Sequence, residues 1–166
     1  AGPPAQIEGA GATISRAMIE ASLLALAASA ALAWAALRRV ALAGAMLAPV
    51  LLAGAVTVAA SVVLGLPFNY ANIIVLPLMI GIGVDSAIHL ALRTLRDDRV
   101  FATSTPRAVA WSAATTIGAF ATLAISEHRG TSSMGVMLAV ALVAAVMMAF
   151  ALTPALVRLA AGRRSA

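Results

Sequence analysis

The chain has 166 residues, of which 63% are hydrophobic and only 10% are charged. Soluble globular domains hold about 45–50% apolar and about 25% charged residues, so this composition excludes water as the main solvent of the chain. The net charge of +5 comes from arginine alone and clusters between apolar runs, which favours membrane orientation over nucleic-acid binding, and the lack of cysteine excludes disulfides and thiolate metal sites.

Five apolar runs follow one another along the chain, each long enough to cross a hydrocarbon core about 30 Å thick. They predict an all-α, polytopic membrane protein, a bundle of five transmembrane helices rich in small residues that let helices approach closely. The ten-residue alternation that is typical of a transmembrane β-barrel is absent. The predicted spans are 17–37, 40–64, 71–92, 107–126 and 133–157.

The basic residues between these spans indicate how the chain crosses the membrane. Arg38 and Arg39 separate the first two spans, four arginines surround the link between the third and fourth, and three follow the fifth. All of these segments fall on one side, whereas the other side holds only Arg16 and Arg129. The positive-inside rule therefore predicts an outer N-terminus and a cytoplasmic C-terminus.

The remaining segments complete the predicted organisation. Residues 1–16 are interpreted as the end of an outer polar region, residues 17–160 as the transmembrane bundle and residues 161–166 as a cytoplasmic tail. The chain begins with Ala1, and its first segment lacks the basic start of a signal peptide. We therefore expect it to be a fragment of a longer polypeptide.

Asp85 is the only acidic residue well within a predicted span. At about 1.5 Å per residue, it would lie roughly 5 Å to the cytoplasmic side of the span centre. An ionised carboxylate at that depth costs about 2.5–3.5 kcal/mol on insertion scales, so the neutral acid is favoured until a partner or water approaches. This predicts proton coupling or ion binding at Asp85, with a structural acid that hydrogen-bonds neighbouring helices as the alternative.

Other residues of the third span set the surroundings of this acid. His89 follows Asp85 at i+4 on the same helical face and belongs either to a relay or to the membrane interface. Pro77 removes a backbone donor, and Gly81 and Gly83 permit a kink or a close helix approach. Tight packing alone is the alternative reading of these three residues.

The fourth span carries a stripe of small and hydroxyl residues. Ser112, Thr115, Thr116 and Ala119 follow the i, i+3, i+4, i+7 spacing of one helical face. We expect this stripe to face the acid and to provide hydrogen bonds or hold water. Serine and threonine also commonly bond the backbone of their own helix, and this alternative stays open.

Enzymatic readings find little support in the sequence. The run Gly81-Ile82-Gly83-Val84-Asp85 is similar to glycine-rich aspartate motifs, but an intramembrane aspartyl protease needs two carboxylates at membrane depth, and Asp97 and Asp98 fall in a link. The chain has no nucleophile elbow, zincin histidine pair or phosphate loop. We expect no enzyme.

Four stretches of the chain resemble the resistance-nodulation-division (RND) superfamily. Leu66–Asn72 (LPFNYAN) and Gly81–Leu90 (GIGVDSAIHL) resemble its lipid-transporting MMPL branch. Thr115–Phe120 (TTIGAF) and Ser126–Gly130 (SEHRG) resemble the hopanoid-biosynthesis-associated members of Gram-negative bacteria. The resemblance covers nearly the whole chain.

This resemblance implies a transporter of twelve transmembrane helices in two halves, in which the chain would supply helices eight to twelve. Residues 1–16 would then end a periplasmic region, and the missing N-terminal half and periplasmic domains would be partners. Asp85 matches the acidic position of the tenth helix, and Thr115 or Thr116 the hydroxyl position of the eleventh. Ser86 departs from the Tyr or Phe that often follows the acid.

The function that the resemblance implies is export of a hydrophobic lipid, such as a hopanoid, from the bacterial inner membrane toward the outer membrane, driven by the proton-motive force. We expect protons as the coupling ion, no cofactor and no metal, and a homo-oligomer. The expected proton relay comprises Asp85, Ser86, His89, Thr115 and Thr116. The alternatives are a sterol-sensing-like membrane domain and a membrane component of protein export.

Overall fold

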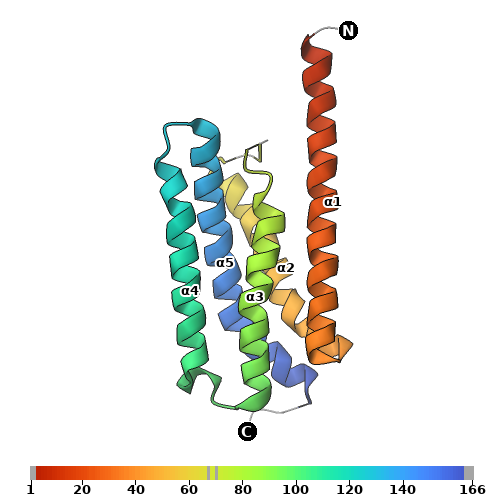
Figure 1. Cartoon of the computed structure of the whole chain (residues 1–166), viewed down its shortest axis with the longest axis vertical. Coiled ribbons are helices and arrows are strands. Elements are labelled where there is room, and N and C mark those ends of the chain that lie inside the picture. Colours follow the sequence, from red (N-terminus) through yellow and green to blue (C-terminus); the bar gives the residue numbers. More distant parts are fainter. Residues whose placement is uncertain (1–2, 67, 70, 163–166) are drawn as a thin grey trace.

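The computed structural model of the protein describes residues 3–66, 68–69 and 71–162. Pro67, Tyr70, Arg163 and Arg164, which entered the motif and the charge arguments above, lie outside the described residues. Within them the chain folds into long helices joined by short links (Figure 1). Five of these helices are long and apolar enough to cross a membrane, which confirms the predicted all-α, five-span fold.

The described elements follow the predicted spans with shifted ends. The helices are α1 (Pro3–Leu37), α2 (Val40–Val63), α3 (Val75–Arg96), α4 (Ser104–Ala121) and α5 (Arg129–Ala160), and two 3₁₀ turns, η1 (Val100–Ala102) and η2 (Thr122–Ile125), flank α4. The membrane-spanning part of α1 is Arg16–Leu37, and the helix continues beyond the other four on the side away from the α1–α2 link (Figure 1).

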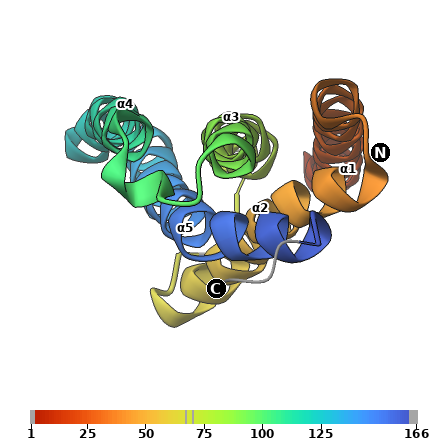
Figure 2. The same ribbon diagram turned by 90° about the horizontal axis from the view of Figure 1, so that it is seen from below.

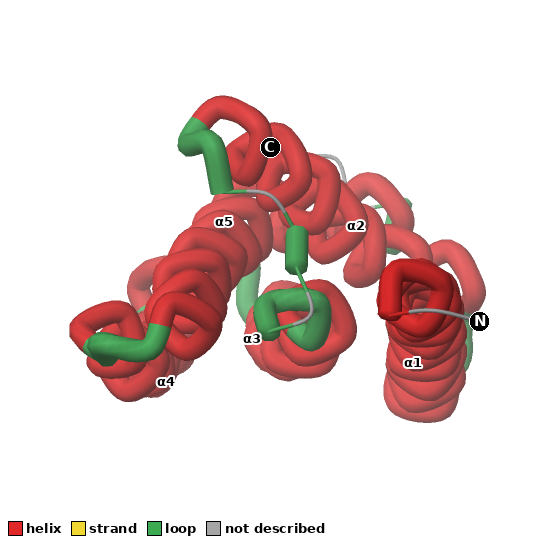
Figure 3. The backbone as a smooth tube through the Cα atoms, turned by 90° about the horizontal axis from the view of Figure 1, so that it is seen from above, coloured by secondary structure: helices red, strands yellow, loops and turns green. Residues whose placement is uncertain are grey.

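The helices form two layers. Viewed along their axes, α1, α3 and α4 lie in one row, and α2 and α5 cross behind them (Figures 2 and 3). The last helix, α5, packs against α2, α3 and α4, whereas α1 packs mainly on α2 and α3. Therefore α5 holds the bundle together, and among the described residues one face of the α1–α3–α4 row carries no further helix.

Small residues bring α3 close to its neighbours in the second layer. A Cβ atom on Gly83 would lie 3.3 Å from the Cβ of Ala145 in α5 and 3.4 Å from a methyl carbon of Val50 in α2. The fully buried Met46, Met79 and Met137 of the same three helices belong to the same hydrophobic core. Gly81, by contrast, faces open space. Close packing on α3 therefore concentrates at Gly83.

The start of α3 differs from the prediction, because the helix begins at Val75 rather than at residue 71. The side-chain oxygen of Asn69 accepts the backbone N–H groups of Ala71 and Asn72, at 2.9 and 3.1 Å, and so holds this segment in a turn. Hydropathy does not report such side-chain bonds. Because the helix also ends later than predicted, at Arg96 rather than at residue 92, Asp85 lies at the midpoint of α3.

The prolines also act differently from the expectation. Pro77 lies in the first turn of α3, where a missing N–H costs no intrahelical bond, so it starts the helix rather than kinking it. Beyond the first turn, the described helices contain Pro49 in α2 and Pro154 in α5, and both are buried.

Both ends of α3 are tied to α5. At one end, the side-chain amides of Asn69 and Asn72 donate to the hydroxyl of Ser133, at 3.2 and 2.9 Å. At the other end, the guanidinium of Arg158 donates to the backbone carbonyl of Asp98, just after α3. Hydrogen bonds therefore link α5 to the chain at both ends of α3, and α4 packs against both helices.

Candidate functional site

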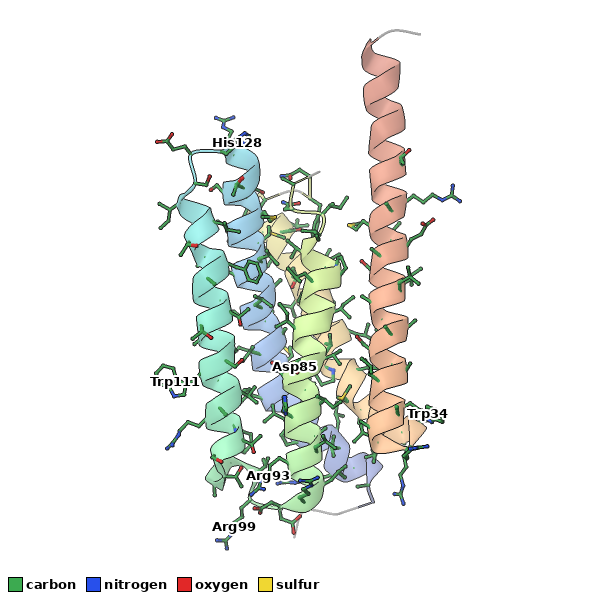
Figure 4. All side chains as sticks on the ribbon, viewed as in Figure 1. Trp34, Asp85, Arg93, Arg99, Trp111 and His128 are labelled. Carbon is green, nitrogen blue, oxygen red and sulfur yellow. The ribbon has the colours of Figure 1, made fainter. Side chains whose placement is uncertain are left out.

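Asp85 lies on the open face of α3. Its side chain is 68% exposed, while the flanking Gly83, Val84, Ser86 and Ala87 are buried. This follows from the helical period, since the buried residues turn toward α2 and α5 and leave Asp85 on the other side. Figure 4 shows the acid at mid-height of the bundle. The carboxylate is therefore not part of the packed core of this chain.

A cavity of about 350 Å³ opens between α3 and α4 beside this carboxylate. Most of its lining side chains are short, polar or both. The lining residues are Asp85, Ser86 and His89 from α3, and Ser104, Thr105, Ala108, Val109 and Ser112 from α4. A space of this size beside a carboxylate, an imidazole and hydroxyl groups can hold several waters.

His89 connects this cavity to a second one nearer the arginine-rich end. Its Nε2 lies 3.5 Å from an Asp85 carboxylate oxygen, an ion-pair distance when the imidazole is protonated. A cavity of about 200 Å³ is lined by His89, Leu92, Arg93, Arg96 and Thr105. Since His89 and Thr105 border both cavities, polar surface continues from mid-helix to the end of α3.

Only part of the predicted hydroxyl stripe reaches this site. Ser112 lines the larger cavity, but Thr115 and Thr116 do not. The hydroxyls of Thr115 and Thr116 donate to the backbone carbonyl of Ser112, at 2.8 and 2.9 Å. This is the geometry of the alternative in which the hydroxyls bond their own helix. Their part in a relay stays a prediction.

Sequence reasoning missed Ser104 and Thr105, because the fourth span was predicted to begin at residue 107. The structure begins α4 at Ser104, with Pro106 in its first turn. Hydroxyl residues followed by proline are typical of a helix start, so this signal was present in the sequence. A helix that starts at Ser104 has Thr105 one turn before Ala108 and two turns before Ser112. The three residues therefore share the face toward α3.

Charges at the end of α3 form a short network. A guanidinium nitrogen of Arg93 lies 3.1 Å from a carboxylate oxygen of Asp97, and the other Asp97 oxygen accepts the backbone N–H of Arg99 at 2.9 Å. Among the residues that the structure describes, no group of three histidine or acidic side chains is placed to hold a metal ion. The titratable and polar groups beside the two cavities are therefore a carboxylate, an imidazole, hydroxyls and guanidinium groups.

Comparison with known proteins agrees with the resemblance seen in the motifs. No protein-family model matches the chain. Two curated relatives, each called a hopanoid transporter HpnN, are 40% identical over 157 residues (Rhodopseudomonas palustris) and 39% identical over 156 residues (Burkholderia multivorans). Each similarity covers 93% of this chain but 18% of the relative, so the chain spans less than a fifth of their length.

Proposed function

Because this chain is related over 93% of its length to hopanoid transporters of the RND superfamily, we propose that it is part of the membrane domain of a proton-driven lipid exporter. The proposed cargo is a hydrophobic lipid such as a hopanoid, moved from the inner membrane toward the outer membrane. One observation carries the proton coupling: Asp85 stands at the midpoint of a membrane-spanning helix, beside a polar cavity.

The proposed coupling uses the two forms of the Asp85 carboxyl group. The charged form keeps water in the cavity between α3 and α4, because burying an unpaired charge is costly. The neutral form permits a drier packing of the same helices, so protonation biases the bundle between two arrangements. Each proton that crosses supplies about 2.3 kcal/mol per 100 mV of membrane potential.

His89 provides the inner step of this proposal. It lies one turn from Asp85 and borders both cavities, so it can accept a proton from the neutral acid and return it to water at the arginine-rich end. The proton moves from the Asp85 oxygen to a His89 nitrogen, directly or through one water, and the carboxylate is left charged. Ser86 and Ser112 border the larger cavity and can orient that water.

The charge distribution supports the proposed orientation. Arg93 and Arg99 lie at one end of the bundle and His128 at the other (Figure 4). By the positive-inside rule the arginine-rich end faces the cytoplasm. The proposed location is therefore the bacterial inner membrane, with α1 leading out to the periplasm and α5 ending at the cytoplasmic side.

The test of this proposal is Asp85→Asn in the full-length protein, expressed at the wild-type level. The amide keeps the size and hydrogen bonding of the acid but cannot ionise. We expect loss of lipid export, measured as transfer of labelled lipid to acceptor vesicles, and loss of coupled proton flux in proteoliposomes. Glu127→Gln is the matched control, because Glu127 is exposed in a loop at the opposite end and should leave both activities unchanged. Full activity of the Asp85 variant would contradict the proposal.

A further inference from the structure

The smaller cavity between α3 and α4 has the lining of an anion site. Of its five lining residues, Arg93 and Arg96 carry guanidinium groups, His89 and Thr105 supply further donors, and Leu92 is apolar. None of them is acidic. Asp85 lines only the neighbouring cavity, and Asp97, which pairs with Arg93, does not line this one. The charge of the cavity is therefore positive.

The two arginines keep donor capacity for a ligand. Asp97 occupies one terminal nitrogen of Arg93, while the Arg93 Nε is buried and has no hydrogen-bond partner. Arg96 forms no ion pair with any acidic side chain in the described part of the chain. The Nε of Arg93 is a buried donor without an acceptor, which is unfavourable, whereas the guanidinium of Arg96 is exposed. Guanidinium groups match the oxygens of a phosphate in bidentate geometry, so a phosphate in the cavity would find donors on both side chains.

The depth of the cavity fits a lipid headgroup. It lies at the last turns of α3, and the exposed Trp34 lies between this level and that of Asp85 (Figure 4). Tryptophan is enriched where hydrocarbon meets the headgroup layer. Basic pockets between transmembrane helices at the cytoplasmic side are typical sites for anionic lipid headgroups.

We propose that this cavity binds the phosphodiester headgroup of an anionic phospholipid from the cytoplasmic leaflet. This inference rests on the proposed orientation but not on the proposed cargo. Arg93 and Arg96 donate to the phosphate oxygens, and Thr105 closes the site from α4. Since His89 and Thr105 also border the Asp85 cavity, a bound headgroup sits at the inner mouth of that cavity and controls access of cytoplasmic water to it.

The experiment measures lipid retention by the full-length protein, using native mass spectrometry after delipidation and addition of phosphatidylglycerol or phosphatidylcholine. We expect the wild type to retain phosphatidylglycerol and not phosphatidylcholine. Arg96→Gln should weaken retention about fivefold, the usual effect of one arginine at an anionic membrane surface, and Arg96→Lys should keep most of it. Arg107→Gln is the matched control, because Arg107 is exposed on α4 and lines neither cavity.

Three outcomes would overturn the inference. Equal retention by the wild type and Arg96→Gln would show that the cavity takes no headgroup. An equal loss in Arg107→Gln would show attraction to general surface charge instead of a site. Displacement of the lipid by millimolar glycerol phosphate would show that the cavity takes soluble phosphates. Thr105→Val, which leaves the arginines intact, repeats the test should Arg96→Gln fail to fold. Export of lipid is measured separately, so failure here leaves the proposed function standing.

Discussion

The two faces of α3 are built on different principles. One face meets α2 and α5 through Gly83, Met79 and Ala87, all buried and apolar. The other face carries Asp85 and His89, both more than half exposed, and borders cavities rather than packed side chains. The difference shows that the close packing of α3 against α2 and α5 lies on one face, which leaves the Asp85 face to carry titratable groups.

The difference between the two faces of α3 follows from the bilayer, which is the solvent of the helix. Within a bilayer, lipid tails are as apolar as leucine, so helices associate through close packing of small residues and not through a hydrophobic drive. The Gly83 face can therefore fix α3 without any polar group. Polar residues at this depth are tolerated only where they meet water or other polar groups, as on the Asp85 face.

The largest loss of stability is expected from a substitution that disrupts the packed face of α3. Gly83→Leu would force atoms into a space where a Cβ alone already lies 3.3 Å from Ala145, and overpacking of this kind costs about 1–3 kcal/mol. We expect a clear drop in the thermal stability of the full-length protein, measured by size-exclusion chromatography after heating. Gly81→Leu, on the open face, is the control and should cost much less. Equal losses would show that the two faces do not differ.

A smaller effect is expected at the tie between α3 and α5. Ser133→Ala removes the hydroxyl that accepts both the Asn69 and the Asn72 amide, and loss of such an acceptor costs about 1–2 kcal/mol. The same heating assay should show an intermediate shift. Thr122→Val is the control, because its exposed hydroxyl bonds only the carbonyl of Ala119 in its own helix. A shift no larger than that of the control would rule out this tie as a source of stability.

The smallest effect is expected on the open face of α3. It tests whether a hydroxyl of α4 acts in the Asp85 cavity or only bonds its own helix. Ser112→Ala removes a hydroxyl from the Asp85 cavity and should slow export about 2- to 10-fold, the value of one hydrogen bond. Thr116→Val should change the rate less than about twofold, because its hydroxyl bonds its own helix. Initial export rates in proteoliposomes compare the two. The opposite ranking would restore the relay role that the family resemblance gives to Thr116.

The sequence was sufficient for the fold because each apolar run exceeds the length that a bilayer requires. An acid within such a run is conspicuous, so the sequence also made Asp85 the candidate residue, whose role stays a prediction, and it correctly placed His89 on the same helical face. It misplaced the start of α3, because the bonds between Asn69 and the following backbone depend on side-chain geometry that hydropathy does not contain.

The partners of Asp85 on α4 were harder to predict. Helical spacing correctly grouped Ser112 with Thr115 and Thr116, but the rotation of α4 about its axis decides which of them reaches α3. That rotation depends on the packing of α4 and of the turn η2 on α5, for example where Gly135 lets the backbone of Leu123 and Ala124 in η2 approach closely. No single-helix pattern contains this rotation, although the hydroxyl residues before Pro106 did carry the signal for the earlier helix start that includes Ser104 and Thr105.

The length of α1 has a mechanical consequence. Its 35 residues give a rod of roughly 52 Å, against about 30 Å of hydrocarbon, and only Arg38 and Arg39 separate its C-terminal end from α2. A rod this long magnifies rotation, so a tilt of about 10° about its C-terminal end sweeps its tip through roughly 9 Å. Angular changes too small to disturb the packed bundle would thus become displacements of several ångströms beyond the membrane.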